Sequence, residues 1–257
     1  MVSRCDVLAV GAHPDDVELG CGGTIARLAG AGHAVGLVDL TAGELGTRGD
    51  VETRRREAEA AAAALGAAWR RCLGLPDGRL AADDPDQLAS LVAILREATP
   101  RAVLGPDAGD PHPDHVATAA LLGRATFLAG VAKFRPDLGP PARPRLALAY
   151  LGPRQLVTPT IVVDVSEAYA RKRAALAVHA SQFDPAGGVA THLASGHFLA
   201  AIDGRDRAAG NTVGVEHGEA FTAIGPLAAA ELAWLLAGRE SRPGSRTPGP
   251  GVGGKEP

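Results

Sequence analysis

Short apolar segments alternate with helical segments over the first half of the chain, and this alternation limits the folds that the chain can adopt. Apolar runs occupy residues 7–11, 34–40 and 102–105, and helical patterns occupy residues 51–65 and 85–97. Near-continuous apolar runs of this length are typical of parallel strands that are buried on both faces. The helices between them form the right-handed crossovers that parallel strands require. The sequence therefore predicts an α/β fold: a doubly wound, mostly parallel, Rossmann-like sheet with helices on both faces.

The second half of the chain has a weaker pattern. Residues 146–151 and 160–165 are typical of two more strands, and Ser166 is expected to cap a helix that ends near residue 180. Between residues 184 and 212 no regular element is predicted. This half therefore predicts the outer part of the sheet less completely than the first half predicts its centre.

The length of 257 residues suits one α/β domain with a substantial core. Residues 228–237 are typical of a final helix, whereas residues 238–257 are rich in Gly, Pro, Ser and Arg. A segment of that composition cannot bury enough apolar surface to fold. We therefore expect a single domain over residues 1–237 and a disordered tail over residues 238–257.

Composition excludes several classes of function. The net charge of -3 provides no basic surface for nucleic acid or an anionic membrane, and no apolar run approaches the length of a membrane span. Asp6 interrupts the first apolar stretch, so no secretory signal is predicted. The three cysteines form no CxxC pair, which argues against a disulfide framework. A cytoplasmic protein is expected.

A polar cluster follows the first predicted strand. His13, Asp15 and Asp16 lie within four positions, directly after the apolar run at residues 7–11. Burying these groups without partners would cost several kcal/mol, and a metal ion would compensate that cost. An imidazole and an aspartate oxygen suit zinc or another first-row divalent metal, and the second aspartate is then free for proton transfer. Taken alone, the cluster is also compatible with a turn that ends in an Asp N-cap.

A second cluster follows the strand predicted at residues 102–105. It contains His112, Asp114 and His115. Alone it could be the solvated start of a helix, and Asp114 could either orient a ligand histidine or cap that helix. Ligands of doubly wound folds bind beyond the carboxyl ends of the strands, and both clusters lie at strand ends. Together they predict a divalent metal site at that edge of the sheet.

Two glycine-containing stretches lie near these clusters. Gly20, Gly22 and Gly23 open the helix predicted at residues 19–30, where glycine is unfavourable unless the backbone approaches a ligand or a strand closely. A polar loop at residues 41–49 ends at the same edge of the sheet, and the helix that follows it begins near Arg54. Arg54 could reach into a cleft there.

Several motifs resemble the LmbE-like/PIG-L family of zinc-dependent N-acetylglucosaminyl deacetylases. They are AHPDDVELGCGGT at residues 12–24, DLTAGELGTRG at 39–49 with a following RxxEA, LGLPDG at 73–78, and HPDH at 112–115. The resemblance covers residues 5–225. The later motifs TIVVDVS, SQF and GVEHGEAF are similar to the branch that deacetylates N-acetylglucosaminyl malate in bacillithiol biosynthesis.

The resemblance implies a role for each matched position. His13, Asp16 and His115 would bind one Zn2+ per chain, or another divalent metal. Asp15 would be the general base, and His112 would stabilise the oxyanion or protonate the leaving amine.

Glu44 and Arg54 would line the sugar pocket. The partner would be a small-molecule N-acetyl amino sugar. The resemblance also implies that the chain forms a homo-oligomer, and hexamers occur in the family. Two histidines and one carboxylate leave coordination positions open, as catalytic zinc sites do. Such a site activates water and polarises an amide carbonyl, while an adjacent carboxylate accepts a proton.

Two positions depart from the bacillithiol branch. Pro111 stands where Arg is frequent, and His217 stands where Tyr is frequent. Both departures concern the malate part of the substrate and leave the deacetylation chemistry unchanged. Arg207 could supply a replacement cation, or it could be a surface arginine.

Three other functions are compatible with the same residues. The first is deacetylation of another N-acetyl amino sugar, such as a mycothiol-type precursor, a chitin disaccharide or an antibiotic intermediate. The second is a non-haem iron oxygenase, which also uses two histidines and a carboxylate. The third is a sugar-binding protein without catalysis. The alternation of strands and helices argues against the oxygenase, because its usual fold is a double-sheet barrel.

Overall fold

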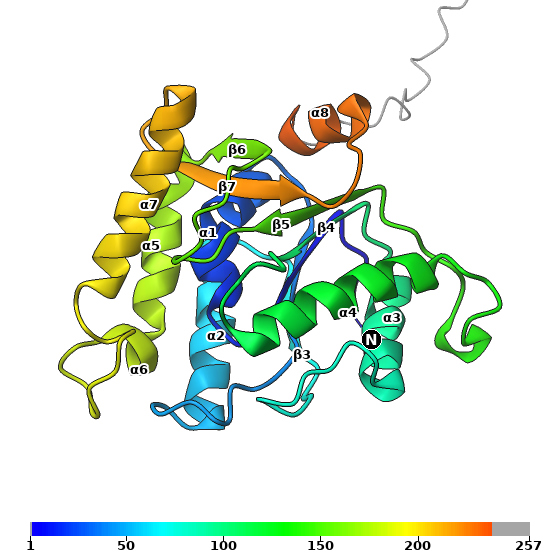
Figure 1. Ribbon diagram of the computed structural model, residues 1–257, viewed down its shortest axis with the longest axis horizontal. Helices are drawn as coiled ribbons and strands as arrows, with labels where there is room; N and C mark the ends of the chain where they lie inside the picture. Colours follow the sequence, from blue (N-terminus) through cyan, green and yellow to red (C-terminus); the bar gives the residue numbers. More distant parts are fainter. Residues whose placement is uncertain (1, 238–257) are drawn as a thin grey trace, which may run out of the picture.

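A computed structural model describes residues 2–237 of the protein (Figure 1). The predicted tail at residues 238–257 lies outside the described residues, so the domain boundaries stay a prediction. The strands are β1 (Val7–Gly11), β2 (Val35–Asp39), β3 (Trp69–Cys72), β4 (Ala102–Pro106), β5 (Leu146–Tyr150), β6 (Ile161–Asp164) and β7 (Gly218–Ala223). The helices are α1 (Asp16–Gly30), α2 (Val51–Leu65), α3 (Pro85–Ala98), α4 (Pro113–Ala129), α5 (Tyr169–Val178), α6 (Ala180–Phe183), α7 (Phe198–Val213) and α8 (Ala229–Ala237), with 3-10 turns η1 (Pro136–Leu138) and η2 (Ser166–Ala168).

The strands described within residues 2–237 form one seven-stranded sheet in the order β3-β2-β1-β4-β5-β7-β6. The neighbours from β3 to β5 pair in parallel, and β7 pairs antiparallel with both β5 and β6. This topology confirms the predicted mostly parallel α/β sheet. In the same part of the chain, no helix is long and apolar enough to cross a membrane.

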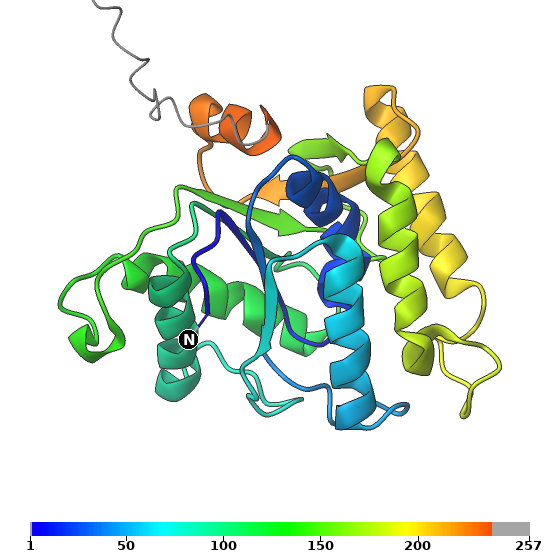
Figure 2. The same ribbon diagram turned by 180° about the vertical axis from the view of Figure 1, so that it is seen from behind.

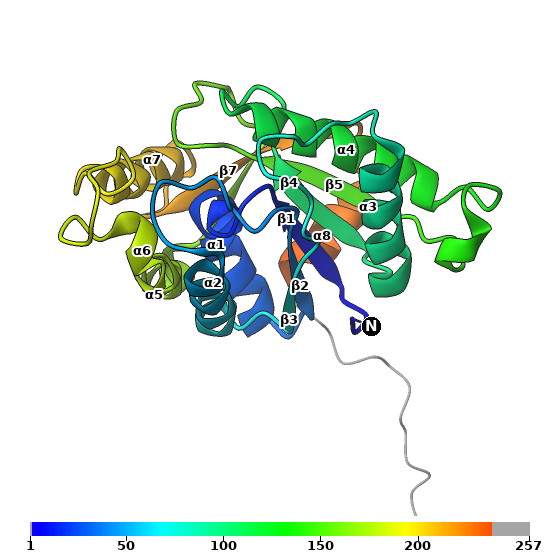
Figure 3. The ribbon, with the colours of Figure 1, turned by 90° about the horizontal axis from the view of Figure 1, so that it is seen from below.

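Helices cover both faces of the sheet, as Figure 3 shows from below: α1, α2 and α5 lie on one side of the strands, and α3 and α4 lie on the other. Figure 2 shows α2 and α5 side by side. In β1, Val7 and Ala9 pack with the first group, while Leu8 and Val10 pack with the second. Successive side chains of a strand point to opposite faces. The apolar runs are continuous because both faces are buried.

Helix α7 is the main element that the sequence pattern does not predict. Its buried side includes Phe198, Ile202, Asp206 and Gly210, which are spaced four residues apart. Only two of these four are large and apolar, and glycine in the interior of a helix is unfavourable. Phe198 and Ile202 pack with Leu19, Leu176 and Phe183, and Gly210 lies close to the backbone of Gly218, so tertiary contacts stabilise α7 more than its own helix propensity does.

Two helices begin earlier than predicted. Helix α1 starts at Asp16, and its backbone leaves the helical region at Cys21, with φ -145° and ψ 22°. The carboxylate of Glu219 accepts hydrogen bonds from the backbone N–H groups of Gly23 (2.9 Å) and Thr24 (2.6 Å), just after this kink. Helix α4 starts at Pro113 instead of His115, because proline is favoured at the first position of a helix.

The glycines at the start of α1 permit a close approach to β5, as the glycine-rich pattern predicted. A Cβ atom added to Gly20 would lie only 2.6 Å from Cε2 of Tyr150. The ring cannot move away easily, because its buried hydroxyl donates a hydrogen bond to the carbonyl of Val10 (3.0 Å). The close contact explains why this position carries glycine.

We therefore expect Gly20→Ala to lower the free energy of unfolding by about 1–3 kcal/mol through overpacking. Urea denaturation of the variant and the unmodified protein measures this change. Gly123, where an added Cβ would meet nothing within 4 Å, provides the control substitution Gly123→Ala. Equal losses for the two variants would contradict the steric explanation.

Candidate functional site

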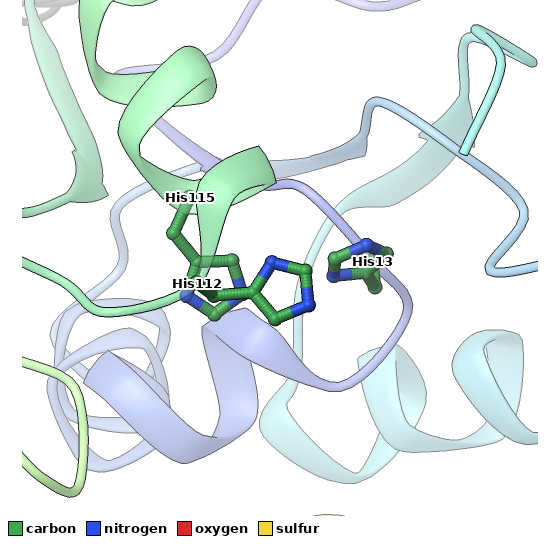
Figure 4. A group of neighbouring side chains, drawn as sticks. All are labelled: His13, His112 and His115. Atoms are coloured by element: carbon green, nitrogen blue, oxygen red, sulfur yellow. The ribbon is translucent and has the colours of Figure 1, made fainter. Parts of the chain in front are cut away.

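The two polar clusters meet because β1 and β4 are parallel neighbours in the sheet. His13 lies in the loop after β1, and His112 and His115 lie at the start of α4, after β4. Figure 4 shows the three imidazole rings grouped together. One ring nitrogen of each lies within 4.8 Å of the others, and the ring centroids of His112 and His115 are 4.6 Å apart. The topology of the sheet thus brings together residues that are about a hundred positions apart.

The carboxylate of Asp16 lies between two of these histidines. Its Oδ2 is 3.5 Å from Nδ1 of His13, and its Oδ1 is 3.1 Å from Nε2 of His115. The same Oδ2 also accepts a hydrogen bond from the backbone N–H of His13 (2.8 Å). The three side chains that the sequence predicts as metal ligands therefore present two nitrogens and a carboxylate to one another.

The second nitrogen of each of these histidines also faces a carboxylate. Nε2 of His13 is 3.1 Å from Asp77 Oδ1 and 3.4 Å from Asp114 Oδ2. Nδ1 of His115 is 3.1 Å from Asp110 Oδ1. Histidines that bind metals commonly donate their other N–H to a carboxylate, which fixes the tautomer and the orientation of the ring. The carboxylates beside His13 and His115 fit histidines that bind a divalent metal ion. The two described groups whose ligand atoms all lie within 4.8 Å of one another are His13 with His112 and His115, and His13 with Asp77 and Asp114, so Asp16 contacts both histidines without belonging to either group.

Sequence reasoning did not select Asp77 or Asp110. Asp77 belongs to a Pro-Asp-Gly sequence, which is typical of a turn, and its carboxylate does accept a hydrogen bond from the N–H of Leu45 (2.9 Å). Asp110 lies two residues before His112 and accepts a hydrogen bond from its N–H (2.8 Å). The short distance between Asp110 and the HPDH motif was the only available signal.

The site carries an excess of negative charge that would favour a cation. Burial by itself lowers the pKa of His13, but the carboxylates of Asp16, Asp15 and Asp77 outweigh it and raise that pKa to about 9. Burial also opposes protonation of His115, yet Asp16 and Asp110 raise its pKa to about 11. The same carboxylates would also stabilise a bound divalent ion. Such an ion would replace the protons on His13 and His115, because metal binding and protonation compete for the imidazoles.

Asp15 has an unusual backbone conformation and a buried side chain. Its φ is 131°, which is rare for a residue other than glycine, and its exposed fraction is 4%. Burial raises its pKa to about 6, although the charge of Arg54 opposes the shift. Backbone strain of this kind tends to occur at functional sites, where surrounding structure maintains it.

Arg54 is buried and supports the loops beside Asp15. Its guanidinium donates to the carbonyls of Gly43 (2.8 Å) and Pro14 (3.0 Å), and its Nη2 is 3.4 Å from Asp15 Oδ2. Arg54 also lines the cavity over the site. Glu44 is exposed and does not line this cavity; its carboxylate accepts a hydrogen bond from the backbone N–H of Asp77 (2.8 Å).

His112 is the N-cap of α4, and its Nδ1 accepts a hydrogen bond from the N–H of Asp114 (3.2 Å). A neutral imidazole that accepts at Nδ1 carries its proton on Nε2. Burial and the neighbouring His115 and His13 lower the pKa of His112, which favours this neutral form. His112 can therefore donate a hydrogen bond from Nε2 at neutral pH.

A cavity of about 390 Å³ lies over these groups. Besides the residues already described, its lining includes Arg48, Pro111, Arg154, His192 and Phe198.

The two other positions discussed from the sequence, Arg207 and His217, lie elsewhere. They line a separate depression, where Arg207 pairs with Asp203 (2.9 Å) and Glu216 (3.4 Å) and His217 stacks on Tyr169. Arg207 therefore does not supply a cation to the cavity.

Comparisons with known proteins give consistent matches. Residues 8–126 match the family model described as "PIG-L: GlcNAc-PI de-N-acetylase". A 1D-myo-inositol 2-acetamido-2-deoxy-alpha-D-glucopyranoside deacetylase from Streptomyces avermitilis is 36% identical over 168 residues, which are 52% of this chain. This chain spans only 57% of the length of that relative.

Two solved structures are similar over most of the chain. The conserved protein TT1542 from Thermus thermophilus is 37% identical, with a TM-score of 0.79 over 88% of this chain and 97% of that one. The N,N'-diacetylchitobiose deacetylase from Pyrococcus horikoshii is 27% identical, with a TM-score of 0.74 over 84% of this chain and 83% of that one. The family model matches residues 8–126, which contain His13, Asp16 and His115, and the similarity to the Thermus protein extends over 97% of that chain. The chain therefore belongs to the PIG-L family.

Proposed function

We propose that the protein is a metal-dependent hydrolase that removes the acetyl group from an N-acetylglucosamine conjugate. The observation that carries this proposal is the placement of the Asp16 carboxylate between Nδ1 of His13 and Nε2 of His115. The buried carboxylate of Asp15 lies directly beside this group in the chain. The relative from Streptomyces avermitilis and the solved structure from Pyrococcus horikoshii are deacetylases named for N-acetyl amino sugars, which supports this class of substrate.

His13, Asp16 and His115 would hold the metal ion, and zinc suits two imidazoles and a carboxylate. Such an ion, when bound, acts as a Lewis acid on the acetyl carbonyl and lowers the pKa of water. Asp77 and Asp110 hold the two imidazoles in orientation from the side opposite Asp16. Asp114 acts with Asp77 on His13.

Asp15 and His112 would move the protons. The pKa of about 6 leaves the Asp15 carboxylate ionised at neutral pH, so it can accept a proton from the water that attacks the carbonyl. His112 can donate a hydrogen bond from Nε2 to the developing oxyanion, or a proton to the departing nitrogen. The amide C–N bond breaks, and the products are acetate and a free amino sugar.

For the substrate itself, we propose N-acetylglucosaminyl malate, the precursor in bacillithiol biosynthesis. The motifs TIVVDVS, SQF and GVEHGEAF support this branch. The second candidate is a mycothiol-type precursor, because the chain is similar to the inositol glycoside deacetylase from Streptomyces avermitilis. Pro111 lines the cavity and provides no cation for a malate carboxylate, so another residue must do so if the first candidate holds.

Acetate release from a panel of substrates tests this function. The panel contains N-acetylglucosaminyl malate, the inositol N-acetylglucosaminide, N,N'-diacetylchitobiose and free N-acetylglucosamine, each assayed with zinc-loaded and with metal-free protein. We expect release only with metal, fastest from the malate conjugate, and without consumption of oxygen. Metal-independent release, or no release from any N-acetyl sugar, would contradict the proposal.

Asp110→Asn is expected to weaken metal binding by about 10- to 100-fold, because the amide holds the imidazole of His115 less well than the carboxylate does. Competition with a chromophoric chelator measures the affinity. Asp83, which is exposed, provides the control variant Asp83→Asn, and its affinity should stay unchanged. An Asp110→Asn protein with unchanged affinity would show that Asp110 does not support a metal ligand.

A further inference from the structure

We propose that the cavity contains an anion subsite, to which Arg154 and Arg48 contribute, that binds a carboxylate or phosphate group on the aglycone of the substrate. This inference rests on the proposed function and specifies its substrate class. Both arginines line the same cavity as His13, Asp15 and Asp16. Neither was selected as a site residue from the sequence, because each is a single arginine in a loop.

Arg154 has no acidic partner. Its side chain is exposed, and among the described residues 2–237 no carboxylate oxygen lies within 4.0 Å of its guanidinium. Elsewhere in the described chain, some exposed arginines form such pairs, for example Arg55 with Glu52 and Arg135 with Asp137, and others such as Arg173 do not. Arg154 differs from Arg173 because it lines the same cavity as the proposed metal ligands. Arg154 therefore presents an uncompensated positive charge to the cavity.

Arg48 is in a similar electrostatic state, although it is buried. Its Nη2 donates to the backbone carbonyl of Asp184 (2.9 Å), and no carboxylate lies within 4.0 Å of it in the described part of the chain. Its own carbonyl accepts a hydrogen bond from Gln182 Nε2 (2.6 Å), which ties its loop to the segment after α6. The remaining N–H groups of the guanidinium are left for a ligand.

The carboxylates of the cavity cannot neutralise these arginines. Asp16 and Asp110 face His115, Asp77 faces His13, and Asp15 faces Arg54. Each of these carboxylates thus already contacts a histidine or Arg54. The charges of Arg154 and Arg48 remain for the ligand, and a guanidinium binds carboxylate and phosphate groups through paired N–H donors.

The loop that carries Arg154 is held beside the catalytic groups. Gln155 accepts a hydrogen bond from the N–H of Gly152 (2.5 Å), and its Nε2 donates to Asp107 Oδ1 (3.0 Å). A Cβ added to Gly152 would lie 3.3 Å from Cγ of Asp110, so this loop packs directly against the residue that orients His115. Arg154 therefore lines the cavity on a loop that packs beside Asp110, where it can contact the part of a substrate that projects from the sugar.

The test compares anionic and neutral substrates. Values of kcat and KM are measured with N-acetylglucosaminyl malate, N-acetylglucosamine 1-phosphate and the neutral methyl N-acetylglucosaminide, for the unmodified enzyme, Arg154→Gln and the control Arg173→Gln. Arg173 is exposed and lines the separate depression. We expect Arg154→Gln to lower kcat/KM for an anionic substrate by roughly 10- to 100-fold, mainly through KM. Turnover of the neutral glycoside should change less than about twofold, within the range of a surface substitution.

The pattern of losses identifies the anion. A selective loss with the malate conjugate supports a carboxylate ligand, and a selective loss with the 1-phosphate supports a phosphate. Equal effects on anionic and neutral substrates, or no effect on either, would overturn the subsite.

Calorimetric binding of N-acetylglucosaminyl malate separates this inference from the proposed function. An unmodified enzyme that binds the conjugate but releases no acetate from any substrate would contradict the deacetylase. Weaker binding to Arg154→Gln would still support the subsite in that case. Equal binding to both proteins, or no binding to either, would overturn it.

Discussion

Asp15→Asn is expected to lower kcat by about 10²- to 10⁴-fold while the protein keeps its metal, because the variant removes a general base and leaves the proposed ligands in place. The carboxylate is 4% exposed and lies beside the proposed ligand Asp16. Asparagine has the same shape and can still accept the contact from Arg54, but it cannot accept a proton from water. Steady-state kinetics and metal analysis of the purified variant measure the two effects separately.

The backbone at this position makes asparagine the informative replacement. Alanine would lose the side-chain contact with Arg54 at a φ of 131° that residues other than glycine rarely adopt, whereas asparagine has the shape of the native aspartate. A loss of activity with asparagine is therefore not a consequence of a distorted loop.

His13→Ala is the comparison for the same experiment, and it should lose both the metal and the activity. If Asp15→Asn lost the metal instead and regained activity on reconstitution, the roles of Asp15 and Asp16 would have to be exchanged.

Lys172→Met is expected to lower the free energy of unfolding by about 3–5 kcal/mol, because it leaves the buried carboxylate of Glu219 without its cation, whereas Asp206 keeps the guanidinium of Arg205 (2.7 Å). Lys172 is fully buried, and its Nζ lies 2.7 Å from Asp206 Oδ2, 2.6 Å from Glu219 Oε1 and 3.2 Å from the carbonyl of Leu19. Glu219 in turn caps the second part of α1. The ammonium group therefore joins α5, α7 and β7 to the helix that carries Asp16.

Urea denaturation of metal-free samples measures this effect. Arg173→Met, at the next and exposed position of α5, is the matched control and should change the stability by less than about 0.5 kcal/mol. A Lys172→Met protein as stable as the unmodified one would show that the Glu219 carboxylate does not need the ammonium charge of Lys172.

Much of the fold could be predicted because its signals are local. Each central parallel strand is buried on both faces, so its residues are apolar without interruption, and helical patterns lie between the strands. The antiparallel pairing of β7 and the position of α7 could not be predicted in the same way. Those segments contain few large apolar residues. They are stabilised by contacts with each other and, for α7, by packing with Leu19, Leu176 and Phe183.

The sequence by itself determined which residues meet at the floor of the site. His13 and Asp16 follow one strand and His112 and His115 follow its parallel neighbour, and the carboxyl ends of parallel strands share one edge of a sheet. The positions of these residues directly after two strands were therefore sufficient to predict that they lie together.

Only the tertiary structure decided what surrounds that floor. Asp77 is 64 positions from His13, and its Pro-Asp-Gly sequence has the pattern of an ordinary turn. Glu44 accepts a hydrogen bond from the loop of Asp77 and does not line the cavity. Arg154 lines the cavity, whereas Arg207 lines a separate depression. An isolated charged residue in a loop has the same local pattern whether it faces solvent, another loop or a ligand. The packing of the loops determines which of these it contacts, and no short segment of the chain records that packing.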